Sequence, residues 1–149
     1  MSQRAKPRAS LRVSVSNHQR NIRLPLRHLQ AFWQAAAQVL RKEEALPLST
    51  IEFHLITQPE MQKLHARHLD DSEPTDVITF THGEIFICPV VARKQAPDWN
   101  RSLQQEVALY GIHGLLHLSG WNDATSSEAQ RMAQAQDALL EKLLKRYPL

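Results

Sequence analysis

Apolar and polar residues follow two periods along this chain, one typical of strands and one typical of helices. Residues 11–16 alternate strictly between apolar and polar, which predicts a half-buried strand, and residues 48–56 read as a second one. Two shorter apolar runs, residues 77–80 and 84–88, are separated by Thr81-His82-Gly83, a link of hairpin length. The pattern therefore predicts about four strands.

Other stretches place apolar residues three and four positions apart, as in a helix with one buried face. The predicted helices are residues 26–40, a segment that Thr57 caps and that continues through His68, a long one from residue 99 or 100 to 119, and residues 126–146. Residues 89–98 are expected to form a loop. Interleaved strands and helices of this kind predict a single α+β domain, with helices packed on one mixed sheet.

Composition places the chain among globular proteins of one domain. We expect residues 1–10 to be a basic disordered tail and residues 11–149 to form the single domain, which at this size can bury a substantial core. The lone Cys88 excludes an internal disulfide and fits a reducing compartment. No apolar run approaches 18 residues, and the N-terminus lacks the apolar core of a signal peptide. The expected location is cytoplasmic, without a membrane contact.

Charge is distributed unevenly along the chain. No acidic residue precedes Glu43, whereas nine of the 18 basic residues lie in the first 42 positions. This asymmetry favours a polyanionic partner, with nucleic acid as the leading candidate. A solvated basic tail and an Arg-rich transit peptide are the alternatives for the first residues. The absence of an amphipathic apolar stripe counts against the transit peptide.

The chemistry concentrates on two histidines, His113 and His117, which lie four residues apart and therefore on one face of a helix. Gly120 is placed to end that helix, because glycine tolerates the left-handed conformation beyond the last turn. The chain can then turn back and carry Asp123 toward the two imidazoles. Two neutral histidines, a carboxylate and an open fourth position make a catalytic type of zinc site.

The residues around the two histidines limit the reactions that such a site could catalyse. The predicted helix is apolar around most of its circumference, which indicates a central and largely buried helix. Glu106 lies seven residues before His113, roughly 10 Å along the axis, so we interpret it as structural. Gly114 stands where zinc proteases carry their glutamate base, which makes a peptidase less favoured. The base would then come from elsewhere or be a metal-bound hydroxide.

The stretch His113-Gly114-Leu115-Leu116-His117-Leu118-Ser119-Gly120-Trp121 closely resembles the signature of the YbeY family. These bacterial single-domain metalloproteins are described as endoribonucleases and rRNA maturation factors, and their usual signature is His-Gly-x-Leu-His-Leu-x-Gly-Tyr-Asp-His. Two further blocks appear in the expected order. Pro74-Thr75-Asp76-Val77-Ile78-Thr79-Phe80 is similar to the family's Pro-Thr-Asp-Val-Leu-Ser-Phe, and Gly83-Glu84-Ile85-Phe86-Ile87 to its Gly-Asp-Ile-x-Ile.

The resemblance implies a zinc-dependent, single-strand endoribonuclease of rRNA maturation and ribosome quality control, with precursor rRNA and the small ribosomal subunit as partners. It implies one Zn²⁺ ion per chain, held by His113, His117 and, in the place of the family's third histidine, Asp123. Water would be activated at that ion. The basic N-terminal third would supply salt-sensitive contacts to phosphates.

The sequence also departs from the family pattern, and the departures keep alternatives open. The family's arginine, thought to bind phosphate, falls on Leu69, and Arg67 would point elsewhere on a helix. His65, His68 and His82 are candidates to rebuild that contact, although each read singly is an ordinary surface residue. The alternatives are a non-catalytic RNA- or ribosome-binding relative that retains the metal, a metal-dependent hydrolase of another substrate, and a structural zinc site.

Overall fold

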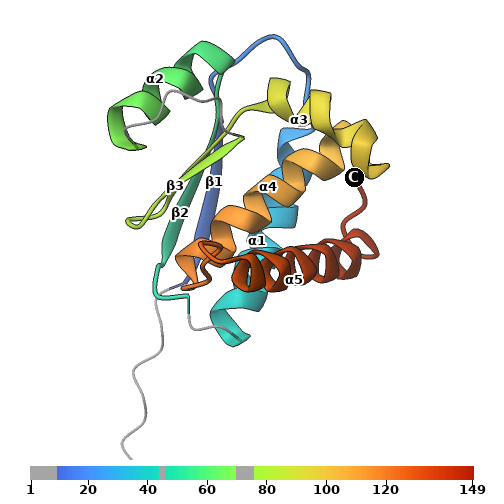
Figure 1. Cartoon of the computed structure of the whole chain (residues 1–149). Helices are drawn as coiled ribbons and strands as arrows, with labels where there is room; N and C mark the ends of the chain where they lie inside the picture. Colours follow the sequence, from blue (N-terminus) through green and yellow to red (C-terminus); the bar gives the residue numbers. More distant parts are fainter. Residues whose placement is uncertain (1–9, 44–45, 70–75) are drawn as a thin grey trace, which may run out of the picture.

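One mixed sheet organises the residues that the computed structural model describes, 10–43, 46–69 and 76–149 (Figure 1). Of His68 and Leu69 only the backbone is described. The strands are β1 (Arg12–Asn17), β2 (Thr50–Leu55), β3 (Val77–Phe80) and β4 (Glu84–Ile87), in the order β1-β2-β4-β3. The pairs β1–β2 and β2–β4 are parallel, and β3 is antiparallel to β4. The predicted four-stranded mixed sheet is confirmed.

The helices lie on both faces of the sheet. Figure 1 shows α1 (Leu26–Glu43), α4 (Leu103–Leu118) and α5 (Ser126–Leu144) on one side, where they enclose the main core, and α2 (Gln58–Leu69) on the other. Met61 and Leu64 of α2 pack together with Ile78 and Phe86 in a second, smaller apolar cluster. Within the described ranges, no helix is long and apolar enough to cross a membrane. The α+β architecture is as predicted, and of the expected tail all but Ser10 lies outside the described residues.

The prediction of a loop over residues 89–98 is wrong. This segment forms the helix α3 (Pro89–Gln95) and the short 3₁₀ helix η1 (Ala96–Trp99). Pro89 occupies the first turn of α3, where a backbone N–H has no helical partner and proline costs nothing. The next helix begins at Leu103 rather than near residue 99, because Asn100 adopts a left-handed conformation with φ of 53°. Ser102 caps it through a capping box with Gln105.

Helix α4 is central because two glycines let its neighbours approach its backbone. A Cβ atom on Gly111 would overlap the indole ring of Trp33, and one on Gly114 would lie 2.8 Å from Cγ2 of Ile85. Trp33 of α1 donates its indole N–H to the carbonyl oxygen of Ala108 at 3.1 Å. Its ring stacks on Phe53 of β2, with centroids 4.1 Å apart. The glycines therefore determine how closely α1 and the sheet pack on α4.

We expect Gly111→Ala to destabilise the fold, by roughly 1–3 kcal/mol, because the added methyl group overlaps the buried ring of Trp33. Helix propensity alone would act in the opposite direction, since alanine is favoured over glycine in a helix by about 1 kcal/mol. Urea denaturation measures the free energy of unfolding. Ala138→Gly, at an exposed position of α5, calibrates the propensity effect. A Gly111→Ala variant more stable than the wild type would contradict the packing described.

Candidate metal centre

The chain reverses direction immediately after the two histidines. Gly120 has φ of +96°, and its N–H donates to the carbonyl oxygen of His117, while the N–H of Trp121 donates to that of Leu116. These two bonds form a Schellman motif, which satisfies carbonyl groups at the end of α4. A Cβ on Gly120 would meet nothing within 4 Å, so its backbone conformation alone calls for glycine. The reversal carries the following residues back toward α4.

The reversal places Asp123 beside the two histidines. The Nε2 atoms of His113 and His117 lie 3.0 Å apart, and each lies 3.6 Å from Oδ2 of Asp123. The two rings are nearly perpendicular, at 83°. All three side chains are partly exposed. The structure thus brings together the three residues that the sequence analysis selected as ligands.

The second ring nitrogens determine which atoms face the centre. Nδ1 of His117 lies 3.0 Å from the carbonyl oxygen of Trp121, and Nδ1 of His113 lies 2.6 Å from Oε1 of Gln136 on α5. Both oxygens are acceptors only, so both Nδ1 atoms carry the proton and donate. In the neutral rings, the Nε2 atoms then present lone pairs to one another and to the carboxylate. A cation between them would turn this repulsion into ligation.

The dimensions of this group suit a small divalent ion. Nitrogen and oxygen ligands at about 2.0–2.1 Å from a tetrahedral ion lie about 3.3 Å from one another. The three observed separations, 3.0, 3.6 and 3.6 Å, bracket that value. Outer partners that fix the ring tautomers, as Trp121 and Gln136 do, are typical of histidines that bind metals. The donor set, two imidazoles and one carboxylate, leaves a fourth position open.

A pocket of about 520 Å³ extends from the metal centre along α4. The metal-centre residues lie at one end, and Trp99 and Arg101 lie at the other. Its walls come from α4, α5, the α3–η1 segment and the start of β3. The remaining lining residues are Asp76, Val77, Gln95, Glu106, Leu109, Tyr110, Ala133, Gln136 and Asp137.

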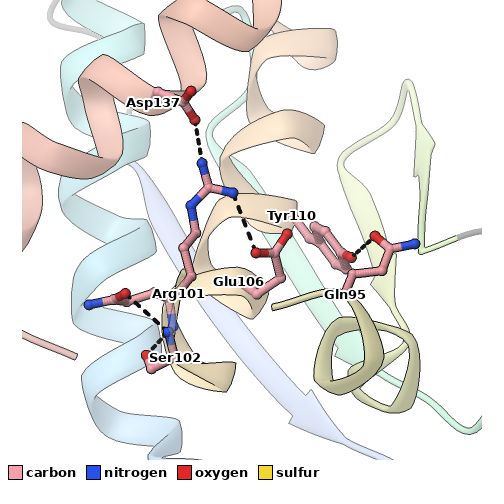
Figure 2. A network of polar contacts seen from close by, with 7 residues as sticks. Gln95, Arg101, Ser102, Glu106, Tyr110 and Asp137 are labelled. Atoms are coloured by element: carbon pink, nitrogen blue, oxygen red, sulfur yellow. Dashed lines mark hydrogen bonds and ion pairs between the residues drawn. The ribbon is translucent and has the colours of Figure 1, made fainter. Parts of the chain in front are cut away.

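The far end of the pocket is held by a polar network (Figure 2). Arg101 contacts Asp137 at 2.8 Å and the buried Glu106 at 3.4 Å, and the hydroxyl of Tyr110 donates to Gln95 at 2.6 Å. Burial raises the pKa of Glu106, and the neighbouring Arg101 opposes that rise. Burial also raises the pKa of Tyr110. Glu106 therefore anchors Arg101, in keeping with the structural role that the sequence analysis assigned to it.

Sequence reasoning missed several residues of the pocket, among them Gln136, Trp99 and Arg101. The indole of Trp99 is 65% exposed, and the guanidinium carbon of Arg101 lies 5.8 Å from its ring centroid. A large side chain so exposed at the mouth of a pocket is suited to contact a ligand. Trp99 and Arg101 lie more than ten positions before His113, so no motif links them to it. Only the turn through η1 and Asn100 brings them to the pocket.

The histidines proposed to rebuild the family's phosphate contact do not line the pocket where the structure describes them. His65 is buried on α2, and its Nδ1 has no hydrogen-bonding partner among the described residues. His82 contacts Glu84 at 2.6 Å in the turn between β3 and β4. The side chains of His68 and Leu69 lie outside the described part of the chain. Arg67 is exposed on α2 and is not part of the pocket lining.

Comparisons with known proteins cover most of the chain. The model of the family "Endoribonuclease YbeY" matches residues 14–144. Endoribonuclease YbeY of Mycolicibacterium gilvum is 34% identical over 122 residues, which span 69% of this chain and 68% of that protein. The protein of the same name from Endomicrobium trichonymphae is 31% identical over 131 residues, spanning 84% of this chain and 92% of that protein.

A solved structure supports the same assignment at the level of the fold. The solution structure of a Thermotoga maritima protein superposes with a TM-score of 0.60 at 21% identity, over 92% of this chain and 91% of the other. The family model, the relatives and the shared fold all extend across the domain that carries the metal centre. The chain therefore belongs to the YbeY endoribonuclease family.

Proposed function

We propose that this chain is a metal-dependent endoribonuclease that cleaves single-stranded RNA in cytoplasmic rRNA maturation and ribosome quality control, with precursor rRNA and the small ribosomal subunit as partners. His113, His117 and Asp123 would hold one Zn²⁺ ion. The observation that carries the proposal is the convergence of these three donor groups in the lining of one pocket. Relatives at about one-third identity are named endoribonucleases, which supports the reaction class.

The residues around the candidate centre have different chemical roles. A divalent ion there would supply a Lewis acid and lower the pKa of a bound water. Trp121 and Gln136 orient the two imidazoles through their Nδ1 atoms. Asp123 adds a negative charge that a third histidine would not bring, so the set would polarise a ligand less strongly than three histidines. The open side of the centre faces the pocket, where a phosphodiester group would enter.

The far end of the pocket suits a nucleobase better than a phosphate. Glu106 and Asp137 pair with Arg101, so that end carries no net positive charge to attract a phosphate. Trp99 instead offers an exposed aromatic face, with Arg101 close to its ring. Unpaired bases stack on such faces, whereas bases within a duplex do not reach them. This arrangement supports a single-stranded substrate with a base on Trp99 and the scissile phosphate at the metal centre.

Phosphate contacts away from the pocket remain assigned to the basic N-terminal third. Arg12, Arg20, Arg23 and Arg27 belong to its described part, and the first nine residues lie outside it. This assignment stays a prediction. It predicts an RNA affinity that falls with salt and does not depend on the base sequence.

We expect His117→Ala to lower the rate of precursor rRNA cleavage by about 100-fold or more, because the metal centre loses one of three ligands. A gel-based cleavage assay with added zinc measures the rate. His28→Ala is the matched control, because His28 is exposed on α1 and outside the pocket lining, and it should cleave like the wild type. Equal cleavage by His117→Ala and wild type would contradict the proposal. Wild-type protein that binds RNA without cleaving it would instead identify the non-catalytic alternative.

We expect Asp123→Ala to contain about one zinc ion per chain fewer than the wild type, because the carboxylate is the only anionic member of the set. Elemental analysis of purified protein after gel filtration measures the content. Asp98→Ala removes an exposed carboxylate on η1 and should leave the content unchanged. Identical zinc contents of Asp123→Ala and wild type would exclude Asp123 as a ligand.

We expect Trp99→Ala to weaken the binding of a single-stranded oligoribonucleotide roughly 5- to 150-fold, since stacking on an aromatic side chain contributes about 1–3 kcal/mol per base. Trp99→Phe keeps an aromatic face and should retain most of the affinity. Fluorescence anisotropy in the His117→Ala background measures binding without cleavage. Because the indole is 65% exposed, the substitution should leave the melting temperature nearly unchanged. Equal affinities of Trp99→Ala and Trp99→Phe would contradict a stacking role.

A further inference from the structure

Five imidazole and carboxylate side chains gather on the sheet face opposite α4. Glu52 and His54 lie on β2 and Glu84 lies on β4, while His18 follows β1 and His82 lies in the turn between β3 and β4. We call these five residues the outer cluster. Side chains alternate between the two faces of a strand, and the intervening residues of β2 and β4 are buried in the core. The outer cluster is therefore separated from the metal centre by the sheet.

Two carboxylates of the outer cluster lie side by side. Glu52 is the register partner of Glu84 in the parallel β2–β4 pair. Like charges on directly neighbouring strand positions destabilise a sheet unless a cation compensates them. Nε2 of His54 approaches both groups, at 2.9 Å from Oε2 of Glu84 and 3.6 Å from Oε2 of Glu52. These three residues place one donor atom each within 4.8 Å of one another.

The ring of His54 is held in one orientation. It stacks on Phe86 at a centroid distance of 4.6 Å and on His18 at 5.3 Å. Its Nδ1 lies 3.1 Å from Nε2 of His18. Only 14% of the side chain is exposed. A ring so constrained directs its Nε2 toward the carboxylates before any ligand binds.

The hydrogen bonding of His54 favours a lone pair on Nε2. Nε2 is buried and lacks a hydrogen bond. Oε2 of Glu84 is only 2.9 Å away, but that oxygen is out of line with a ring N–H. If Nδ1 instead carries the proton and donates to His18, the lone pair of Nε2 stays free, with a glutamate oxygen on Glu84 and one on Glu52 nearby. This is the tautomer that a metal-binding histidine adopts, with its other nitrogen bonded to an outer partner.

The remaining histidine orients Glu84. Nε2 of His82 lies 2.6 Å from Oε1 of Glu84, the oxygen that does not face His54. One oxygen of Glu84 is therefore bonded to His82, and the other lies beside His54.

We propose that Glu52, His54 and Glu84 bind a second divalent transition-metal ion that joins β2 to β4. One imidazole and two carboxylates are ligands that suit Zn²⁺ and its first-row neighbours. His18 and His82 would act as outer partners that orient His54 and Glu84. Because the ion binds the folded sheet and not the separated strands, it raises stability. This site does not depend on the proposed ribonuclease activity.

The test uses full-length His117→Ala protein, in which the first centre is disabled, and Zn²⁺ as the probe. Isothermal titration calorimetry should find one remaining zinc ion per chain, and zinc should raise the melting temperature. Adding Glu52→Gln should weaken this binding at least about tenfold and remove the thermal shift, since the uncharged amide is a far poorer ligand. Glu52 is half exposed, so the isosteric glutamine preserves the fold. Adding His28→Ala instead should change neither measurement.

Two further variants test whether the remaining zinc ion binds at the outer cluster. In the same background, Glu84→Gln should abolish the remaining zinc binding, and His18→Ala should weaken it about 10- to 100-fold, the range measured for outer partners of metal ligands. The proposal is overturned if His117→Ala protein binds no zinc, or if it binds zinc with the same affinity whether position 52 is glutamate or glutamine. The first result would leave His54 as part of an ion pair only. Cleavage assays do not enter this test, so a failure here leaves the proposed function unaffected.

Discussion

The close approach of α1 and the sheet to the backbone of α4 is the constraint on which the rest of this structure depends. Gly111 admits the indole of Trp33, and Gly114 admits Ile85, so α1 and the sheet pack closely on neighbouring parts of the helix surface. His113 lies between the two glycines in sequence, and His117 lies one turn later on the same face. With two faces of α4 closed by packing, these side chains project toward α5 and the pocket. The apolar core thus decides the direction in which the polar site opens.

The metal centre follows from this orientation through hydrogen bonds rather than through the ligands alone. Trp121 and Gln136 accept hydrogen bonds from the outer nitrogens of the two histidines, which leaves the lone pairs of the inner nitrogens directed inward. Gly120 reverses the chain and brings Asp123 within 3.6 Å of both Nε2 atoms. The centre is preorganised because three separate elements, α4, the turn after it and α5, each fix one part of it. Such outer partners are usual around histidines that bind metals, and they support the proposed site.

The two donor clusters lie on opposite faces of the sheet and are built by different means. At the metal centre, helix geometry spaces two ligands and a helix-ending turn adds the third. In the outer cluster, strand register alone sets Glu52 opposite Glu84, and ring stacking on Phe86 holds His54 between them. The first opens into a pocket, whereas the second lies on the outer surface of two strands. This contrast favours a catalytic role for the first and a stabilising role for the second.

Periodicity and local motifs were sufficient to predict much of the secondary structure and the place of the candidate site. The strands, the histidine helix and the approach of Asp123 to the two histidines all depend on interactions within a few residues, such as a four-residue helical spacing or a glycine that ends a helix. The segment after Pro89 was predicted wrongly, because proline is compatible both with a loop and with the first turn of a helix. Tertiary structure alone decided the long-range features. Trp99 and Arg101 reach the pocket, and Glu52 of β2 comes beside Glu84 of β4, because packing and strand register bring together residues that no sequence spacing connects.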